Sequence, residues 1–276
     1  MRNKIIYNYE LDSLNDREFK VNLNSLGKDK ILFDSTIFKS KEIERYIRDL
    51  KDELQSNNFF IIKNFGTSTN NFVLLNFLLS KKLYFSKRMS IYLHNFKTKI
   101  NTLELSEELV SGGFHTDFAF QDVVPDFISL QCLETDPKYP YLGRNYIVNA
   151  TDIFNILLKK FNLTKKYLLQ ISLPYTFGNK TIWLKPFYII TNNRIEMKIH
   201  IKYVDTSKLK KEHYIENISL VELINQISLN LATDIVLDKG DILIISNKFL
   251  LHKRGECSIN LIENKSRELN SMRFFI

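Results

Sequence analysis

The stretch Gly112-Gly113-Phe114-His115-Thr116-Asp117 places a histidine and a carboxylate two residues apart. On an extended backbone, residues i and i+2 project to the same face, so the imidazole of His115 and the carboxylate of Asp117 can converge on one ion. These side chains supply only two ligands. The face of two histidines and one carboxylate that holds non-haem Fe(II) needs a further histidine from elsewhere in the chain.

His252 is the candidate for that further ligand. It follows the stretch Lys239-Gly240-Asp241-Ile242-Leu243-Ile244-Ile245-Ser246-Asn247, which has the pattern of a turn, an apolar strand and a polar segment. A hairpin-like turn followed by a buried strand would deliver His252 into the core of a barrel.

Each of these residues also has a simpler explanation. A His-x-Asp tripeptide occurs often by chance, and a lone histidine after a strand is more often a satisfied core or surface residue. The other histidines, His94, His200 and His213, lack metal-type partners at a usable spacing, so we expect core or surface roles for them. The order of the motifs, with Arg267 fifteen residues beyond His252, makes chance the weaker explanation.

The pattern around these motifs predicts one β-rich domain with helices packed outside it. Strands are predicted at 59–62, 127–133, 146–148, several between 169 and 203, 235–237, 242–245 and 272–276, with helices beginning near Ser40, Asn70, Thr151 and Ser219. We expect a single domain over residues 1–276, in which 1–56 form an N-terminal flanking segment and helix.

Several of these segments together resemble the clavaminate synthase and taurine dioxygenase superfamily of Fe(II)- and 2-oxoglutarate-dependent oxygenases, with a layout similar to that of carbapenem synthase. The resemblance covers roughly residues 57–276 and is carried by Gly113 to Asp117, Phe127 to Leu133, Gly240 to Asn247, His252-Lys253-Arg254 and Arg267-Glu268-Leu269. It implies a mixed α+β, β-rich fold in which residues 57–276 form a double-stranded β-helix (jelly roll) core with helical insertions and flanking helices.

Carried over residue by residue, the resemblance implies that His115, Asp117 and His252 hold the iron. Arg267 matches the arginine that binds the distal carboxylate of the cosubstrate 2-oxoglutarate, a role that suits a planar guanidinium because it stays charged when desolvated. Arg254 matches a position that is often basic beside this cosubstrate. O2 is the second cosubstrate.

The chain departs from the family pattern in two places. Where the family often has a threonine that contacts 2-oxoglutarate, this register holds Asn145 or Tyr146, and either side chain could donate instead. Where several members have a second arginine for a substrate anion, Ser271 stands. Arg273 follows on the same strand face, and it is either a substitute for that arginine or an exposed strand residue.

The expected activity is hydroxylation of an unactivated C–H bond in a free amino acid or small amino-acid-derived metabolite, with release of succinate and CO2. Related halogenases carry a small residue in place of the carboxylate ligand, so Asp117 favours oxygenation over chlorination. Desaturation, cyclisation or epimerisation at the same site remain alternatives, as does a non-catalytic β-barrel binding module that retains the motif.

The formal net charge of +8 is the only feature that could indicate nucleic acid as a partner. The lysines and arginines are scattered, so we attribute the charge to compositional bias and expect neither nucleic acid nor a membrane as partner. The longest apolar stretch, 72–79, is too short to span a bilayer, and residues 1–12 show no secretory signal. Cys132 and Cys257 form no CxxC or zinc motif, so we expect a reducing compartment, most simply the cytoplasm. The sequence leaves the oligomeric state open.

Overall fold

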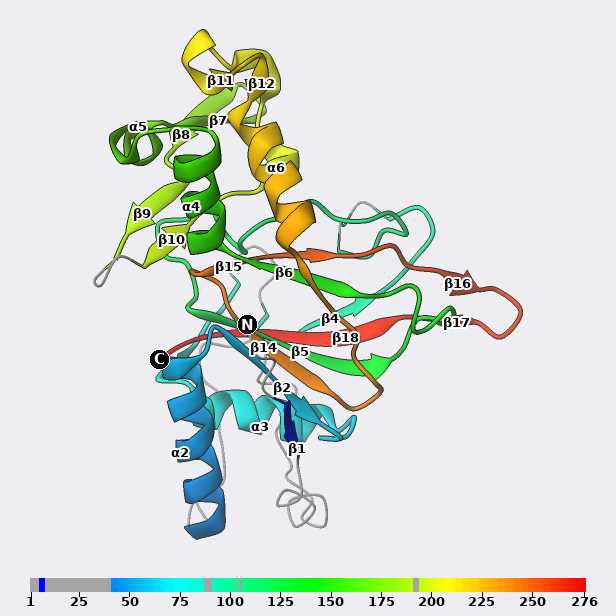
Figure 1. The fold of residues 1–276 in the computed structure, drawn as a ribbon. Helices are drawn as coiled ribbons and strands as arrows, with labels where there is room; N and C mark the ends of the chain where they lie inside the picture. Colours follow the sequence, from blue (N-terminus) through cyan, green and yellow to red (C-terminus); the bar gives the residue numbers. More distant parts are fainter. Residues whose placement is uncertain (1–4, 8–40, 87–90, 103, 105, 191–193) are drawn as a thin grey trace.

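The computed structural model describes residues 5–7, 41–86, 91–102, 104, 106–190 and 194–276. These residues form a mixed α+β structure in which strands predominate and the helices pack outside the main sheets (Figure 1). The predicted β-rich class with flanking helices is therefore confirmed. Among the described helices, none is both long and apolar enough to cross a membrane.

The larger sheet has seven strands, and all of its pairings are antiparallel except the one between its first two strands. In order across the sheet the strands are β1 (Ile5–Tyr7), β2 (Phe59–Lys63), β14 (Ile242–Ser246), β5 (Phe127–Glu134), β18 (Glu268–Phe275) and β3 (Lys82–Leu83), and β4 (His94–Lys97) also pairs with β18. Residues 242–245 of strand β14 are all apolar because both faces of the strand are covered. Ile242 and Ile244 pack under helices, whereas Leu243 and Ile245 face the smaller sheet.

The smaller sheet consists of three antiparallel strands, β13 (Thr233–Ile235), β6 (Asn145–Asn149) and β15 (Leu250–Arg254). Its inward side chains, such as Ile147 and Leu250, join one apolar cluster with inward side chains of the larger sheet. Strands β14 and β15 follow each other in the chain but belong to different sheets. The short turn between them therefore crosses from one sheet to the other.

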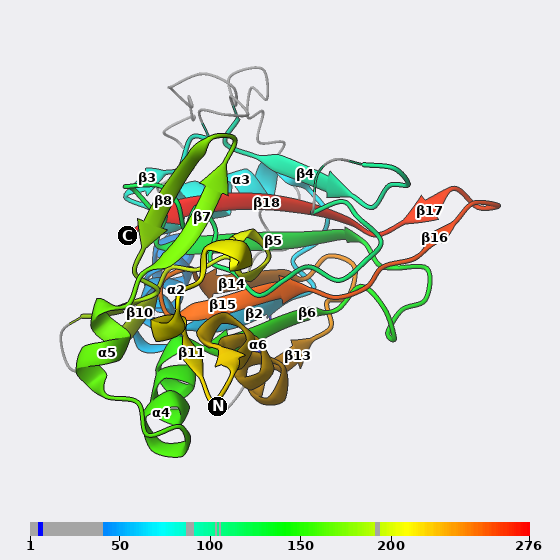
Figure 2. The same ribbon diagram turned by 90° about the horizontal axis from the view of Figure 1, so that it is seen from above.

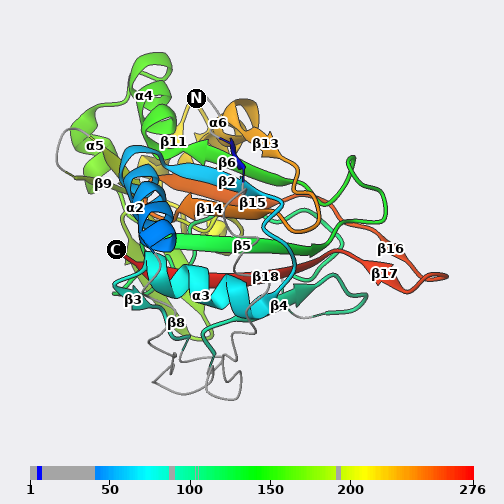
Figure 3. The same ribbon diagram turned by 90° about the horizontal axis from the view of Figure 1, so that it is seen from below.

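Two helices, α2 (Lys41–Ser56) and α3 (Thr69–Leu79), cover the outer face of the larger sheet (Figure 3). Helix α3 begins at Thr69 because the side chain of Ser68 accepts a hydrogen bond from the amide of Asn71. The predicted start of the preceding helix at Ser40 lies outside the described residues.

A second group of elements covers the outer face of the smaller sheet (Figures 1 and 2). Helices α4 (Ala150–Lys160) and α6 (Leu220–Leu231) share an apolar cluster with Val148 of β6 and Leu251 of β15. The same group contains α5 (Lys165–Gln170) and the hairpins β7 (Leu173–Phe177) with β8 (Lys180–Leu184), β9 (Phe187–Ile189) with β10 (Ile195–Met197), and β11 (Tyr214–Ile215) with β12 (Ile218–Ser219). A further hairpin, β16 (Ile259–Asn260) with β17 (Lys265–Ser266), extends away from the body of the protein (Figure 1).

The predicted element boundaries agree with the structure to within a few residues. Helix α6 starts where expected, since the side chain of Ser219 accepts a hydrogen bond from the Glu222 amide. Helix α4 instead starts one residue before Thr151, because Asn149 rather than Thr151 is its cap. Strand β18 begins four residues earlier than the predicted 272–276 and carries a register shift between Glu268 and Leu269.

Candidate metal centre

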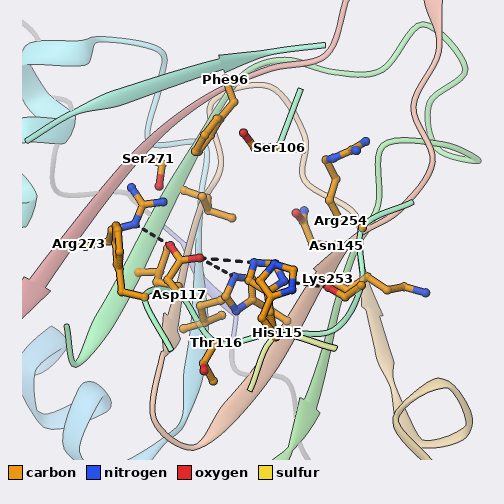
Figure 4. Close-up of a pocket in the computed structure, with 18 of the residues that line it drawn as sticks. Phe96, Ser106, His115, Thr116, Asp117, Asn145, Lys253, Arg254, Ser271 and Arg273 are labelled. Atoms are coloured by element: carbon orange, nitrogen blue, oxygen red, sulfur yellow. Dashed lines mark hydrogen bonds and ion pairs between the residues drawn. The ribbon is translucent and has the colours of Figure 1, made fainter. Parts of the chain in front are cut away.

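A cavity of about 320 Å³ lies between the two sheets (Figure 4). Its walls combine strands of the larger sheet, strands of the smaller sheet and the segment from Gly112 to Phe120. Of the residues assigned to the site from the sequence, eight line this cavity: His115, Asp117, Asn145, His252, Arg254, Arg267, Ser271 and Arg273. Tyr146 does not.

The three predicted iron ligands meet at one point of the cavity wall. Nε2 of His115 lies 3.4 Å from Oδ1 of Asp117, and Nε2 of His252 lies 3.5 Å from the same oxygen. One donor atom from each of the three side chains falls within 4.8 Å of the others. Metal–ligand bonds of about 2.0–2.2 Å place neighbouring ligand atoms roughly 3 Å apart, so this arrangement fits a single ion.

Strand pairing brings the two histidines together. His252 pairs with Ile147 inside the smaller sheet, and His115 continues that sheet on the other side of β15. The backbone amide of each histidine donates to the carbonyl of the other, at 3.0 and 2.9 Å. Nδ1 of His115 lies 2.8 Å from the carbonyl oxygen of Gly113. When Nδ1 donates to that carbonyl, Nε2 keeps its lone pair for a metal.

The carboxylate of Asp117 has a different partner on each oxygen. Oδ1 faces the two imidazoles, whereas Oδ2 accepts a hydrogen bond from Nε of Arg273 at 2.6 Å. Burial would raise the pKa of Asp117, but the charge of Arg273 and the neighbouring imidazoles of His115 and His252 outweigh it. The pKa of this carboxyl therefore lies well below its usual range, and the group is ionised as a metal ligand requires.

Arg267 is a buried cation, with 6% of its surface exposed. Its Nη2 donates to Oδ1 of Asn145 at 2.9 Å, and among the described residues no carboxylate forms an ion pair with its guanidinium. Burial lowers the pKa of Arg267, because the protein interior replaces water poorly around a charge. Because an unpaired buried charge costs several kcal/mol, this arginine is suited to receive an anion.

Asn145 and Tyr146 point to opposite faces of β6. Asn145 lines the cavity, whereas Tyr146 lies on the outer face, where Nζ of Lys253 is 5.0 Å from its ring centroid. The prediction that Tyr146 could contact the cosubstrate is therefore wrong. Successive strand residues alternate between faces, and this strand turns Asn145 inward.

Arg254 lines the cavity, but its terminal nitrogens are already engaged with backbone carbonyls. Nη1 donates to the carbonyl oxygen of Gly255 at 3.1 Å, and Nη2 donates to that of Val110 at 2.6 Å. In Figure 4, Arg254 and Asn145 lie on one side of the His115–Asp117 pair, while Ser271 and Arg273 lie on the other.

Ser271 and Arg273 lie on the cavity-facing side of β18, and Arg267, which directly precedes this strand, lines the same cavity, as the spacing predicted. Ser271 is fully buried, and its Oγ has no hydrogen-bond partner among the described residues. The side chain of Arg273 is only 13% exposed, so the alternative that it is an exposed strand residue is wrong.

Two further histidines line the cavity, contrary to the expectation of simple core or surface roles. His200 stacks on His115 with ring centroids 4.7 Å apart, and His94 stands opposite Ser271 in the pairing of β4 with β18. Burial lowers the pKa of His200 to about 3 and that of His94 to about 4. His213 has the predicted core role, since it is buried with Nε2 2.8 Å from the carbonyl oxygen of Ser172.

No protein-family model matches this sequence, and no curated protein matches it. Solved structures nevertheless resemble it along most of its length. An asparagine oxygenase in complex with Fe(II), (2S,3S)-3-hydroxyasparagine and succinate has 10% sequence identity and a TM-score of 0.71, with 98% of this chain and 93% of that chain covered. A taurine dioxygenase from Burkholderia xenovorans has 11% identity and a TM-score of 0.60, with 83% and 81% covered.

The non-haem iron oxygenase OrfP is similar in two complexes. With Fe and alpha-ketoglutaric acid it has 12% identity, a TM-score of 0.64 and coverage of 99% of this chain and 94% of that chain. With Fe, succinate and (3S)-hydroxy-L-Arg it has 12% identity, a TM-score of 0.65 and coverage of 98% and 93%. The resemblance predicted from the motifs is thus confirmed as a likeness of fold.

Proposed function

We propose that this chain, which has the fold of the taurine dioxygenase-like iron enzymes, is itself an Fe(II)- and 2-oxoglutarate-dependent oxygenase. The observation that carries the proposal is the convergence of His115, Asp117 and His252 on one point of an internal cavity. Two imidazoles and one carboxylate are the donor set of non-haem Fe(II) oxygenases, and they leave coordination positions open for other ligands. Burial lowers the pKa of His252 to about 4, so its imidazole is neutral and available to bind a metal at neutral pH.

We further propose that the two facing sheets are the halves of a double-stranded β-helix. The chain crosses between them at the turn from β14 to β15, as that architecture requires. We assign residues 1–276 to one domain. Both cysteines are free thiols, which supports a reducing, cytoplasmic location.

Arg267 would bind the distal carboxylate of 2-oxoglutarate. It is buried, carries no ion pair among the described residues and lines the same cavity as the three proposed ligands. Asn145 accepts a hydrogen bond from Nη2, which fixes the plane of the guanidinium before an anion arrives. A side chain that is already oriented loses less conformational entropy when the anion binds.

When bound, iron with 2-oxoglutarate and O2 supplies the oxidising chemistry, in which release of succinate and CO2 accompanies insertion of one oxygen atom into a C–H bond. The residues of this chain hold the reactants in place and keep water away. Apolar side chains of the cavity wall, such as Phe96, Ile128 and Leu243, surround the three proposed ligands.

The substrate that this site fits is a free amino acid or a small amino-acid-derived molecule. Two of the similar structures hold hydroxylated amino acids, 3-hydroxyasparagine and (3S)-hydroxy-L-Arg. On the side of Asp117 away from Asn145, Ser271 offers an unpartnered hydroxyl and Arg273 offers terminal nitrogens that can bind a substrate carboxylate. We assign these two residues to substrate binding.

The test is succinate formation by the Fe(II)-loaded protein with 2-oxoglutarate, O2 and a panel of amino acids. We expect one or more amino acids to stimulate succinate release. His115→Ala, Asp117→Ala and His252→Ala should each lose most of the iron and all turnover, whereas His213→Gln, at a buried histidine away from the cavity, should keep both. A wild-type protein that binds no Fe(II) would overturn the proposal.

A further inference from the structure

The backbone of Asp117 is held by a buried amide side chain from another element. Asn247 directly follows strand β14 and has no exposed surface. Its Oδ1 accepts a hydrogen bond from the amide nitrogen of Asp117 at 2.7 Å. Its Nδ2 donates to the carbonyl oxygens of Asp117 at 3.0 Å and of Pro125 at 3.1 Å. One side chain thus fixes both polar groups of the Asp117 backbone.

The backbone conformation of Phe118, the residue after Asp117, gives a reason for these hydrogen bonds from Asn247. Phe118 has a φ of 59°, in the left-handed region that bulky residues rarely enter. A non-glycine residue persists there only when its surroundings fix it, and functional sites are where such strain gathers. On one side of this turn, Thr116 bonds to Ile199, its amide donating to the carbonyl oxygen at 2.9 Å. On the other side, Asn247 bonds to Asp117.

Asn247 also connects Asp117 with the segment of the chain that carries His252. Asn247 lies in the turn that carries the chain from the larger sheet to the smaller one, and His252 follows on the strand after this turn. The same short segment therefore supplies one proposed ligand and fixes the backbone of another.

Arg273 does not duplicate this role. Arg273 bonds to Oδ2 of Asp117 and so orients the carboxylate. Asn247 bonds to the backbone of Asp117 and so fixes the position from which that side chain extends. We infer that Asn247 is a positioning residue for the metal centre, which holds Asp117 at the distance from His115 and His252 that one ion requires. This inference rests on the proposed function, because it assumes that the three side chains bind a metal.

The experiment is titration of the metal-free full chain with Co(II), followed by its visible absorption, which reports both affinity and coordination geometry. Asn247→Ala should weaken Co(II) binding about 10–100-fold and change the spectrum of the bound ion, as loss of groups that orient metal ligands does. Asn247→Asp keeps an acceptor for the Asp117 amide but loses the donor to two carbonyls. It should therefore also bind Co(II) more weakly, and it serves as the deciding variant if Asn247→Ala does not fold.

Asn270→Ala is the matched control. Asn270 is also a strand-associated, buried asparagine with several side-chain hydrogen bonds, to Asn95, Thr69 and Gln131, but it lies between two residues of β18 that face the cavity and itself points away. The Asn270→Ala substitution should lower the melting temperature of the metal-free protein, but it should leave the Co(II) affinity and the Co(II) spectrum unchanged.

Equal loss of Co(II) affinity in Asn270→Ala and Asn247→Ala would show that general destabilisation is the cause and would overturn the inference. Unchanged affinity and spectrum in both Asn247 variants would overturn it as well. A wild-type chain that binds no Co(II) or Fe(II) is a different result, since it removes the proposed function itself.

Discussion

Arg273 donates from Nε to Oδ2 of Asp117 across 2.6 Å, and this bond leaves Oδ1 as the oxygen that faces His115 and His252. A carboxylate held in this way presents one oxygen to a metal, because the other oxygen is already occupied. One-oxygen ligation keeps more coordination positions open for a cosubstrate that binds through two atoms. The pair therefore joins the residue proposed for the substrate to the ligand proposed for the metal.

The first prediction separates the two roles of Arg273. Arg273→Gln should weaken Fe(II) binding about 10–100-fold, because the outer oxygen of Asp117 loses its charged partner. Arg273→Lys should restore much of the metal affinity, since a single ammonium can still bond to Oδ2. The same lysine lacks the planar fork, so the substrate KM should stay high. If Arg273→Lys restored both the metal affinity and the wild-type substrate KM, a role of Arg273 in substrate binding would be contradicted.

The second prediction concerns the cosubstrate. Arg267→Ala should raise the 2-oxoglutarate requirement by an amount that corresponds to about 2–5 kcal/mol, the cost of truncating one partner of a buried charge pair. The Fe(II) requirement should change far less, because Arg267 does not contact the three proposed ligands. Steady-state kinetics with each component varied in turn measure both effects. If Arg273→Ala raises the 2-oxoglutarate requirement and Arg267→Ala does not, the two arginines are assigned the wrong way round.

The parts of the site that the sequence predicted are those with a local signature. The spacing of His115 and Asp117 is a property of extended backbone, and the apolar run before His252 marks a buried strand. Arg267 and Arg273 were placed on one strand face by alternation alone. Each of these inferences needs only the residues next to it in the chain.

The parts that the sequence did not predict depend on contacts between distant segments. Nothing in the chain order shows that His200 stacks on His115, or that Asn247 binds the backbone of Asp117. The choice between Asn145 and Tyr146 was left open for a related reason. Alternation fixes which residues share a face, but which face turns inward depends on pairing with β15 and β13.

The third prediction concerns the stability of the metal-free protein in acid. The pKa of His200 is near 6.5 in an unfolded chain but about 3 in the folded protein, where burial is the main cause. Below pH 6.5 the unfolded state therefore takes up a proton that the folded state does not, and stability falls as the pH drops towards the folded pKa. From pH 7 to pH 5 this one histidine should cost about 1–2 kcal/mol.

Urea denaturation of the wild type and of His200→Gln at pH 7 and pH 5, both in the presence of a chelator, measures this contribution. The variant should lose about 1–2 kcal/mol less than the wild type over that interval, because it removes a group that the folded state keeps neutral. His252, with a folded pKa of about 4, remains in both proteins and accounts for part of the loss that they share. Equal losses in the two proteins would show that His200 is protonated in the folded state.

The last prediction is that the product gains oxygen rather than chlorine. A halide bound to the metal would need the coordination position that we propose for Asp117, and the ionised carboxylate disfavours a second anion at that point. Turnover under 18O2 in chloride buffer should give a product heavier by one labelled oxygen and free of chlorine. Asp117→Gly would open this position, but it would also remove the negative charge that bonds to Arg273 and is proposed to bind the metal, so its main effect should be loss of iron. A chlorinated product from the unmodified protein would refute the argument, whereas a product lighter by two hydrogens would keep the metal site and change the reaction to desaturation.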